Sequence, residues 1–111
     1  MRTDANRLHD LLEAISVIEK YRPATRDQFD GDEPVQSHIL RQLQIIGEAA
    51  SRVSPQAQGA NPQVPWRQIA GMRNAIVHAY FQIDWNEVWN TINRDVPVLK
   101  PLIQSALDTL P

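Results

Sequence analysis

The sequence predicts an all-α fold, an antiparallel four-helix bundle with a short C-terminal helix, and three observations support it. Four long segments repeat apolar residues at intervals of three and four, which is the spacing of one buried helical face. No segment alternates apolar and polar residues for long enough to form a strand. The 111 residues suffice for one hydrophobic core, so we expect a single domain over residues 1–111.

The first helix is expected over residues 2–21, because its apolar residues form one stripe and Pro23 follows it. That stripe consists of Leu8, Leu11, Leu12, Ile15 and Ile18. Residues 24–33 contain four acids and one glycine and are predicted to be a connector. Within this connector, Phe29 is expected to insert into the core.

The second helix is expected to begin at Pro34 and to end near Val53, since proline suits the first turn of a helix. Its buried stripe consists of Ile39, Leu43, Ile46, Ala50 and Val53. Gly47 lies inside this helix, where glycine costs about 1 kcal/mol relative to alanine. A close approach of another backbone would explain why a glycine occurs at this position. Residues 54–64 are rich in Pro, Gln, Asn and Gly and are predicted to be a loop.

The third helix is predicted to begin at Pro65 and to end near Gln82. Asp84 is a suitable N-cap for the fourth, and Pro97 either kinks that helix or begins a fifth. The apolar stripe of this last part consists of Trp85, Val88, Trp89, Ile92, Val96, Val98, Leu99, Leu102, Ile103, Ala106 and Leu107. Tryptophans can stack on bases, but those of this chain stand among apolar residues, so we expect core packing instead.

The charge pattern argues against a long nucleic-acid track, because the net charge is −2. Residues 34–83 differ from the rest of the chain, since they carry four arginines and one glutamate, a local charge of +3. A local positive site is therefore compatible with the sequence. Without cysteines, an apolar signal segment or an apolar run of about 20 residues, the chain is expected to be cytoplasmic and not to enter a membrane.

Arg73, His78 and Tyr80 lie in the predicted third helix and carry the chemistry that we expect of the chain. At 100° per residue, Arg73 and His78 project about 140° apart, so one helix alone makes a poor site. Both flank a mildly apolar strip that is a candidate subunit interface, formed by Ala70, Val77 and Phe81. A two-fold interface there would bring two copies of the Arg–His pair face to face.

Such a pair could cleave RNA without a metal ion, through attack of a ribose 2′-hydroxyl on the neighbouring phosphorus. His78 could act as base or acid, Arg73 could hold the developing negative charge, and Asn74 could orient a reacting group. Arg67 either binds phosphate or forms a solvated face. Glu48 either orients Arg73 or pairs with Arg52, four residues on. No metal site or cofactor is expected, since His9 and Glu13 lack a third ligand with suitable spacing.

Arg73, His78 and Tyr80 match an Arg-x-x-x-x-His-x-Tyr motif, and through it the chain resembles the HepT family of HEPN-domain toxins. The resemblance covers roughly positions 39–103. It is carried by Ile45–Ala50, Val64–Trp66, Gly71–Asn74, Val77–Phe81, Trp89 and Pro97. One departure is Ala79, where relatives often carry glycine or an acid, and it is expected to alter only a local contact.

The resemblance implies a HEPN-like bundle and a metal-independent ribonuclease that acts as a homodimer, with Arg73 and His78 in a composite cleft. It also implies a toxin–antitoxin pair of the HepT–MntA type, in which an MntA-like nucleotidyltransferase antitoxin transfers AMP to Tyr80. A bulky anion on Tyr80 would fill the cleft and repel an RNA phosphate. Two alternatives stay open: a catalytically weak interaction module that binds the transferase, and an accessory subunit that binds the transferase's nucleotide or substrate.

Overall fold

The computed structural model describes residues 2–72, 74 and 82–110. The chain is mostly helical there, which confirms the predicted all-α class. In chain order the elements are α1 (Asp4–Tyr21), α2 (Arg26–Asp30), α3 (Glu33–Ser51), α4 (Pro55–Ala60), α5 (Trp66–Ala70), α7 (Trp85–Asn90), the π-helical turn η2 (Thr91–Asp95) and α8 (Val96–Asp108).

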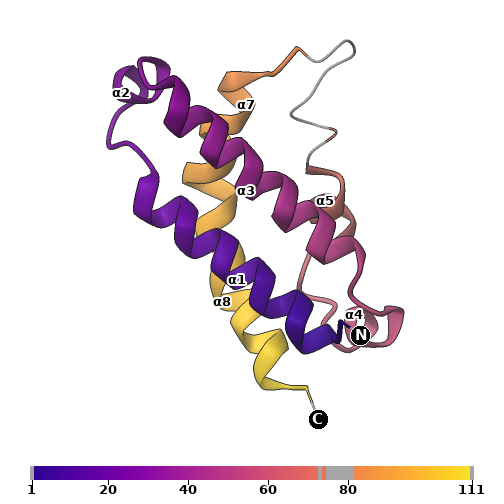
Figure 1. The fold of residues 1–111 in the computed structure, drawn as a ribbon. Coiled ribbons are helices and arrows are strands. Elements are labelled where there is room, and N and C mark those ends of the chain that lie inside the picture. The colour runs from indigo at the N-terminus through magenta and orange to yellow at the C-terminus, as the bar shows by residue number, and fades with distance from the viewer. Residues whose placement is uncertain (1, 73, 75–81, 111) are drawn as a thin grey trace.

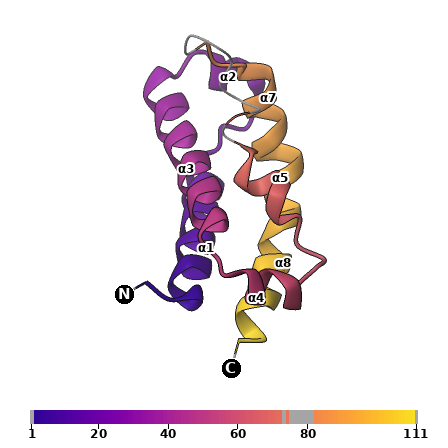
Figure 2. The same ribbon diagram turned by 90° about the vertical axis from the view of Figure 1, so that its right-hand side faces the viewer.

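The helices form two layers around the core (Figures 1 and 2). Helices α1 and α3 lie side by side in one layer, and α5, α7 and α8 form the other. The short α4 lies at the end of the bundle where both termini emerge, and α2 lies at the opposite end. Fully buried aliphatic side chains from α1, α3, η2 and α8 fill the space between the layers, among them Leu11, Ile15, Leu43, Ile46, Ile92 and Ile103.

The first helix begins two residues later than predicted, because Thr3 is its N-cap. The Thr3 hydroxyl accepts from the Asn6 backbone N–H at 3.1 Å, and the Asn6 side chain accepts from the Thr3 backbone N–H at 3.1 Å. This reciprocal cap satisfies two N–H groups at the helix start. The helix ends at Tyr21, two residues before Pro23, as predicted.

The predicted connector contains the short helix α2, which delivers Phe29 to the core. Phe29 is fully buried and contacts two tryptophans, with ring centroids 6.0 Å from Trp85 and 5.3 Å from Trp89. The expected core positions of Phe29 and of these partly buried tryptophans are therefore confirmed. Through these rings, α2 is packed against α7.

Helix α3 confirms the predicted second helix, although Pro34 occupies its second position because Asp32 is the N-cap. Gly47 meets the neighbouring helix α5 as expected. A Cβ atom at this position would lie 3.3 Å from the carbonyl oxygen of Ile69 and 3.5 Å from that of Ala70. The glycine thus permits close contact between the α3 and α5 backbones.

The predicted loop over residues 54–64 is wrong in part, since residues 55–60 form α4. Ser54 caps this helix by accepting from the Ala57 backbone N–H at 3.2 Å. Asp4 at the start of α1 holds Ser54 in turn, accepting from its backbone N–H at 2.9 Å and from its hydroxyl at 2.6 Å. A tertiary contact with a residue 50 positions away therefore supports a helix that local composition does not favour.

The predicted third helix is interrupted, because α5 ends at Ala70 with Gly71 as its C-cap. The Gly71 backbone N–H donates to the Arg67 carbonyl at 2.9 Å. Met72 and Asn74 are helical again, and Gln82 is not. The part of the prediction that covers residues 73 and 75–81 lies outside the described residues.

Asp84 caps α7 as predicted, accepting from the Glu87 backbone N–H at 3.1 Å. Of the two alternatives for Pro97, the one in which it begins a further helix is confirmed, since Pro97 is the second residue of α8, and a wide turn precedes that helix. In η2 the Val96 backbone N–H reaches back five residues to the Thr91 carbonyl. Pro97 then stands in the first turn of α8, where a missing N–H is tolerated.

Two side chains supply donors around this wide turn. Pro97 has no N–H for the carbonyl of Ile92, five residues before it, and the Arg22 guanidinium donates to that oxygen at 3.5 Å. The Asn93 side-chain amide donates to the Trp89 carbonyl at 2.8 Å. Arg22 follows α1 directly, so the turn is also attached to the other layer of the bundle.

Candidate functional site

Three of the residues expected to carry the chemistry, Arg73, His78 and Tyr80, lie outside the described residues. Their proposed arrangement across a two-fold interface therefore stays a prediction. The structure describes the elements on either side of them. Helix α5 and Met72 precede the segment, Asn74 lies within it, and Asp84 caps α7 after it.

The position of α5 is determined by its two contacts, with α3 through Gly47 and with α4 through Trp66. The Trp66 indole N–H donates to the carbonyls of Asn61 at 3.0 Å and Gln58 at 3.2 Å. Asn61 is buried, and its own amide donates to the Ala57 carbonyl at 3.0 Å while its side-chain oxygen accepts from Thr109 at 3.3 Å. This polar network anchors the start of α5 to α4 and to the end of α8.

The supporting residues expected near the motif are exposed. Asn74 is helical and exposed, which is compatible with an orienting role. Arg67 is exposed on α5 and forms no ion pair within the described part of the chain. Its charge is thus available to an anion from solvent, as the phosphate-binding alternative requires.

Glu48 pairs with Arg52, which is the structural alternative that the sequence offered. Its Oε1 accepts from the Arg52 Nε at 2.7 Å, and both side chains are more than half exposed. An exposed i, i+4 pair contributes only about 0.3–0.5 kcal/mol. Because Glu48 follows Gly47, it also lies on the turn of α3 that contacts the end of α5.

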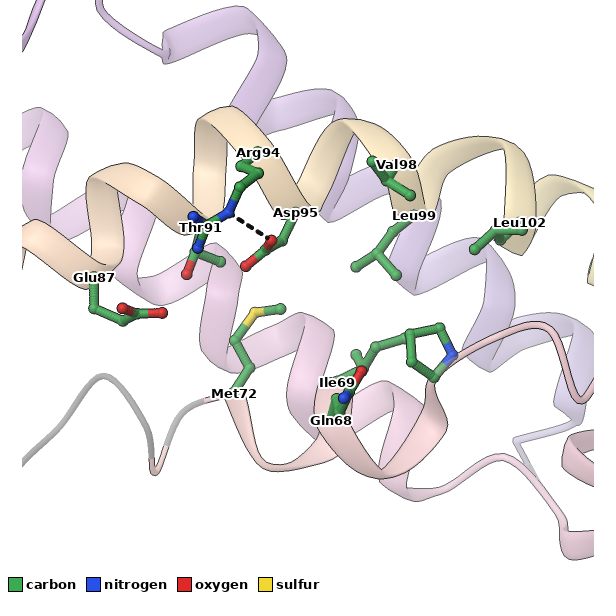
Figure 3. A pocket seen from close by; sticks show the side chains of 11 residues that line it. Gln68, Ile69, Met72, Glu87, Thr91, Arg94, Asp95, Val98, Leu99 and Leu102 are labelled. Carbon is green, nitrogen blue, oxygen red and sulfur yellow. Dashed lines mark hydrogen bonds and ion pairs between the residues drawn. The ribbon is translucent and has the colours of Figure 1, made fainter.

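A groove of about 440 Å³ lies between α5 and the α7–η2–α8 rod. Figure 3 shows Met72 extending from the end of α5 toward Asp95 and Leu99 across the groove. Its floor is largely apolar, and its charged groups are Glu87 and an ion pair of 3.4 Å between Arg94 Nε and Asp95. Two carboxylates against one guanidinium make this groove unfavourable for an RNA phosphate.

Within residues 2–72, 74 and 82–110, no group of three or more His, Cys, Asp or Glu side chains is arranged to hold a metal ion. No helix in the same ranges is long and apolar enough to cross a bilayer.

Comparison with known proteins places the chain in a family. The model of the family described as "Ribonuclease HepT-like" matches residues 11–106, which is most of the chain and includes the Arg-x-x-x-x-His-x-Tyr motif. The chain belongs to the HepT-like ribonuclease family. The predicted resemblance is thereby confirmed, and the HepT-like match includes α3, α5 and nearly all of α8.

Three HepT-like relatives match along most of their own length. "Probable ribonuclease HepT" of Thermococcus cleftensis is 37% identical over 100 residues, covering 89% of this chain and 91% of the relative. "Putative RNase MJ1380" of Methanocaldococcus jannaschii is 33% identical, with 87% and 90% covered. "Putative RNase TTE0752" of Caldanaerobacter subterraneus subsp. tengcongensis is 31% identical, with 89% and 88% covered. No solved structure matches the chain significantly.

Sequence reasoning did not identify every residue that shapes this region. Asn61 lies in the segment predicted as a loop, and its contacts were not predicted: its carbonyl accepts from the Trp66 indole of α5, and its amide donates to the Ala57 carbonyl of α4. Arg7 and Arg41 lie 34 positions apart, yet they line one hollow between α1 and α3. Arg7 and Arg41 come together only because α1 and α3 pack antiparallel to each other, so no local motif could have indicated that they share a site.

Proposed function

We propose that the chain is a metal-independent endoribonuclease that acts as a homodimeric cytoplasmic toxin. The observation that carries this proposal is the Arg73–His78–Tyr80 motif within a chain that matches the HepT-like family over residues 11–106. The printed names of the relatives, which describe ribonucleases, support the substrate class. The local positive charge of residues 34–83 supports contact with an anion.

In the proposed reaction, the ribose 2′-oxygen attacks the adjacent phosphorus and the bond to the 5′-oxygen breaks. One His78 removes the 2′-hydroxyl proton, and the His78 of the second copy in the dimer donates a proton to the leaving 5′-oxygen. Arg73 stabilises the extra negative charge on the phosphoryl oxygens. The products are a 2′,3′-cyclic phosphate and a free 5′-hydroxyl, so no oxidant or further reactant is needed.

The proposed control of this activity is AMP transfer to Tyr80 by an MntA-like nucleotidyltransferase antitoxin. The Tyr80 oxygen attacks the α-phosphorus of ATP, a phosphodiester forms, and pyrophosphate leaves with the proton of the phenol released to solvent. The added phosphate would repel an RNA phosphate at the cleft.

The test is RNA cleavage by the purified, unmodified protein in the presence of EDTA. Wild-type protein is expected to cleave, whereas His78→Ala and Arg73→Ala are expected to lose at least about 100-fold in rate, the usual range for acid–base catalysis. His9→Ala and Arg94→Ala are matched controls, because both side chains are exposed and belong to other elements. Undiminished cleavage by His78→Ala would overturn the proposal.

A second candidate is a catalytically weak subunit that binds the transferase, and the net charge of −2 favours it. It predicts a stable complex with the transferase and no RNA cleavage by wild-type protein. Intact mass after incubation with the transferase and ATP tests the regulatory link. A gain of AMP units mapped to Tyr80 supports that link for either candidate.

A further inference from the structure

A second hollow, of about 320 Å³, is lined by polar and charged side chains together with Ile45 and Ala49. It is formed by α1 and α3, the two helices of one layer (Figure 1). Arg7 and Asp10 contribute from α1, and Arg41, Gln44 and Glu48 contribute from α3. Arg41, Gln44 and Glu48 follow the three- and four-residue spacing of one helical face, so they form a continuous ridge.

The unpaired charged groups of this hollow are positive, because each of its two carboxylates forms an ion pair. Asp10 forms an ion pair with Arg2, and Glu48 forms one with Arg52 at 2.7 Å. Arg7 and Arg41 form no ion pair within the described part of the chain. Two arginines and two carboxylates line the hollow, and pairing of both carboxylates with Arg2 and Arg52, which lie outside the lining, leaves Arg7 and Arg41 as its unpaired charges.

The chemistry of the hollow suits a phosphodiester. Each guanidinium can donate two parallel hydrogen bonds to phosphate oxygens, and the Gln44 amide can donate to a phosphate or a ribose oxygen. The groove between α5 and α8 has the opposite character, since it holds two carboxylates and one guanidinium. Of these two hollows, the one between α1 and α3 is the more favourable for a polyanion, because ion pairing leaves two guanidiniums there and the Glu87 carboxylate in the groove.

We propose that Arg7 and Arg41 bind backbone phosphates of the RNA that flank the scissile bond, as a binding site separate from the Arg73–His78 motif. This inference rests on the proposed ribonuclease function. Helix α3 lies between the hollow and α5, because Arg41, Gln44 and Glu48 border the hollow while Gly47 contacts α5, the described helix that precedes the motif in the sequence. An RNA strand that crosses α3 from the hollow would reach α5.

The experiment measures binding of a fluorescein-labelled single-stranded RNA 12-mer to full-length protein carrying His78→Ala, as a function of salt. Arg7→Gln/Arg41→Gln is added to this background and compared with Lys20→Gln/Arg26→Gln. The control removes the same charge from the exposed Lys20 and from Arg26, which already pairs with Asp30 at 2.7 Å. Circular dichroism confirms that both variants are folded.

The hollow variant is expected to bind at least about tenfold more weakly at low salt, with a salt slope smaller by about 1.4, because each lost phosphate contact on a single strand contributes about 0.7. The control should match the His78→Ala parent. Equal losses in both variants, or no loss in either, would overturn the inference.

Cleavage in the background with native His78 separates this inference from the proposed function. The hollow variant is expected to lose at least about tenfold more kcat/KM on the 12-mer than on a dinucleotide, which has no phosphodiester besides the scissile one. If wild type cleaves both substrates and the two losses are equal, the inference fails and the ribonuclease function stands. If wild type cleaves neither substrate and binds no RNA, both the inference and the ribonuclease function fail.

If the variant loses only affinity for the transferase, the hollow is a protein-binding surface and the inference is overturned.

Discussion

Gly47 of α3 lies against the backbone of Ile69 in α5, where a Cβ atom would come within 3.3 Å of the carbonyl oxygen. Because that oxygen belongs to the backbone, it cannot rotate away from a larger side chain. The same contact positions the helix that precedes Met72 and Asn74. A substitution at Gly47 should therefore affect both stability and the proposed activity.

Gly47→Leu is expected to lower the free energy of unfolding by about 1–3 kcal/mol, the usual cost of overpacking. Gly59→Leu in α4 is the matched control, since nothing lies within 4 Å of a Cβ atom there. The control should change stability by only about 0.5 kcal/mol or less. Urea unfolding at one fixed protein concentration measures both, and similar losses in the two variants would contradict the close contact.

Phe29→Ala is expected to lower stability by about 3–5 kcal/mol, because the ring is fully buried and packs on Trp85 and Trp89. The matched control is Tyr21→Ala, since this aromatic side chain is 44% exposed. Thermal unfolding followed by tryptophan fluorescence measures the difference. A Phe29 variant as stable as the control would show that α2 does not support the bundle.

Ser54→Ala and Asp4→Ala are each expected to lower stability by about 1–2 kcal/mol, because each removes part of one linked N-cap. The double variant should lose clearly less than the sum of the two single losses, since both substitutions break the same hydrogen bonds. A double-mutant cycle from urea unfolding measures this coupling. Strict additivity would mean that Asp4 and Ser54 act independently.

Glu48→Gln and Arg52→Gln both break one exposed ion pair and should each change stability by less than about 0.5 kcal/mol. Their effects on RNA cleavage separate the two roles considered for Glu48. If Glu48 orients Arg73, Glu48→Gln lowers kcat while Arg52→Gln leaves it nearly unchanged. If both variants retain the wild-type kcat, the pair with Arg52 is the whole role of Glu48.

The sequence predicted the features of the fold that depend on periodicity and local caps. The stripes of α1 and α3, the core position of Phe29 and the Asp84 cap all follow from side-chain spacing or from one local hydrogen bond. It did not predict α4, which depends on the distant contact between Asp4 and Ser54, or the interruption at Gly71. The first depends on tertiary packing that single-sequence patterns do not contain, whereas the second occurs at a glycine, a residue common at helix ends.

In the candidate site, too, the sequence predicts one part, and the other part depends on the fold. The motif residues Arg73, His78 and Tyr80 are adjacent in the sequence, so the pattern identifies them without a structure. Arg7 and Arg41 come together only because α1 and α3 are antiparallel neighbours, and their unpaired state depends on where Arg2 and Arg52 direct their side chains. Neither the proximity of these two arginines nor their unpaired state can be predicted from the spacing of residues in the sequence.

The wide turn of η2 also has a consequence for insertions and deletions. A π-turn accommodates one extra residue within an α-helix, so deletion of Asn93 should restore ordinary helical pitch while α7 and α8 keep their buried faces. The ring of Pro97 would then stand inside a regular helix, at a cost of about 3 kcal/mol. The shortened chain should consequently fold well only when Pro97→Ala accompanies the deletion. The length of this segment and the proline that follows it therefore depend on each other.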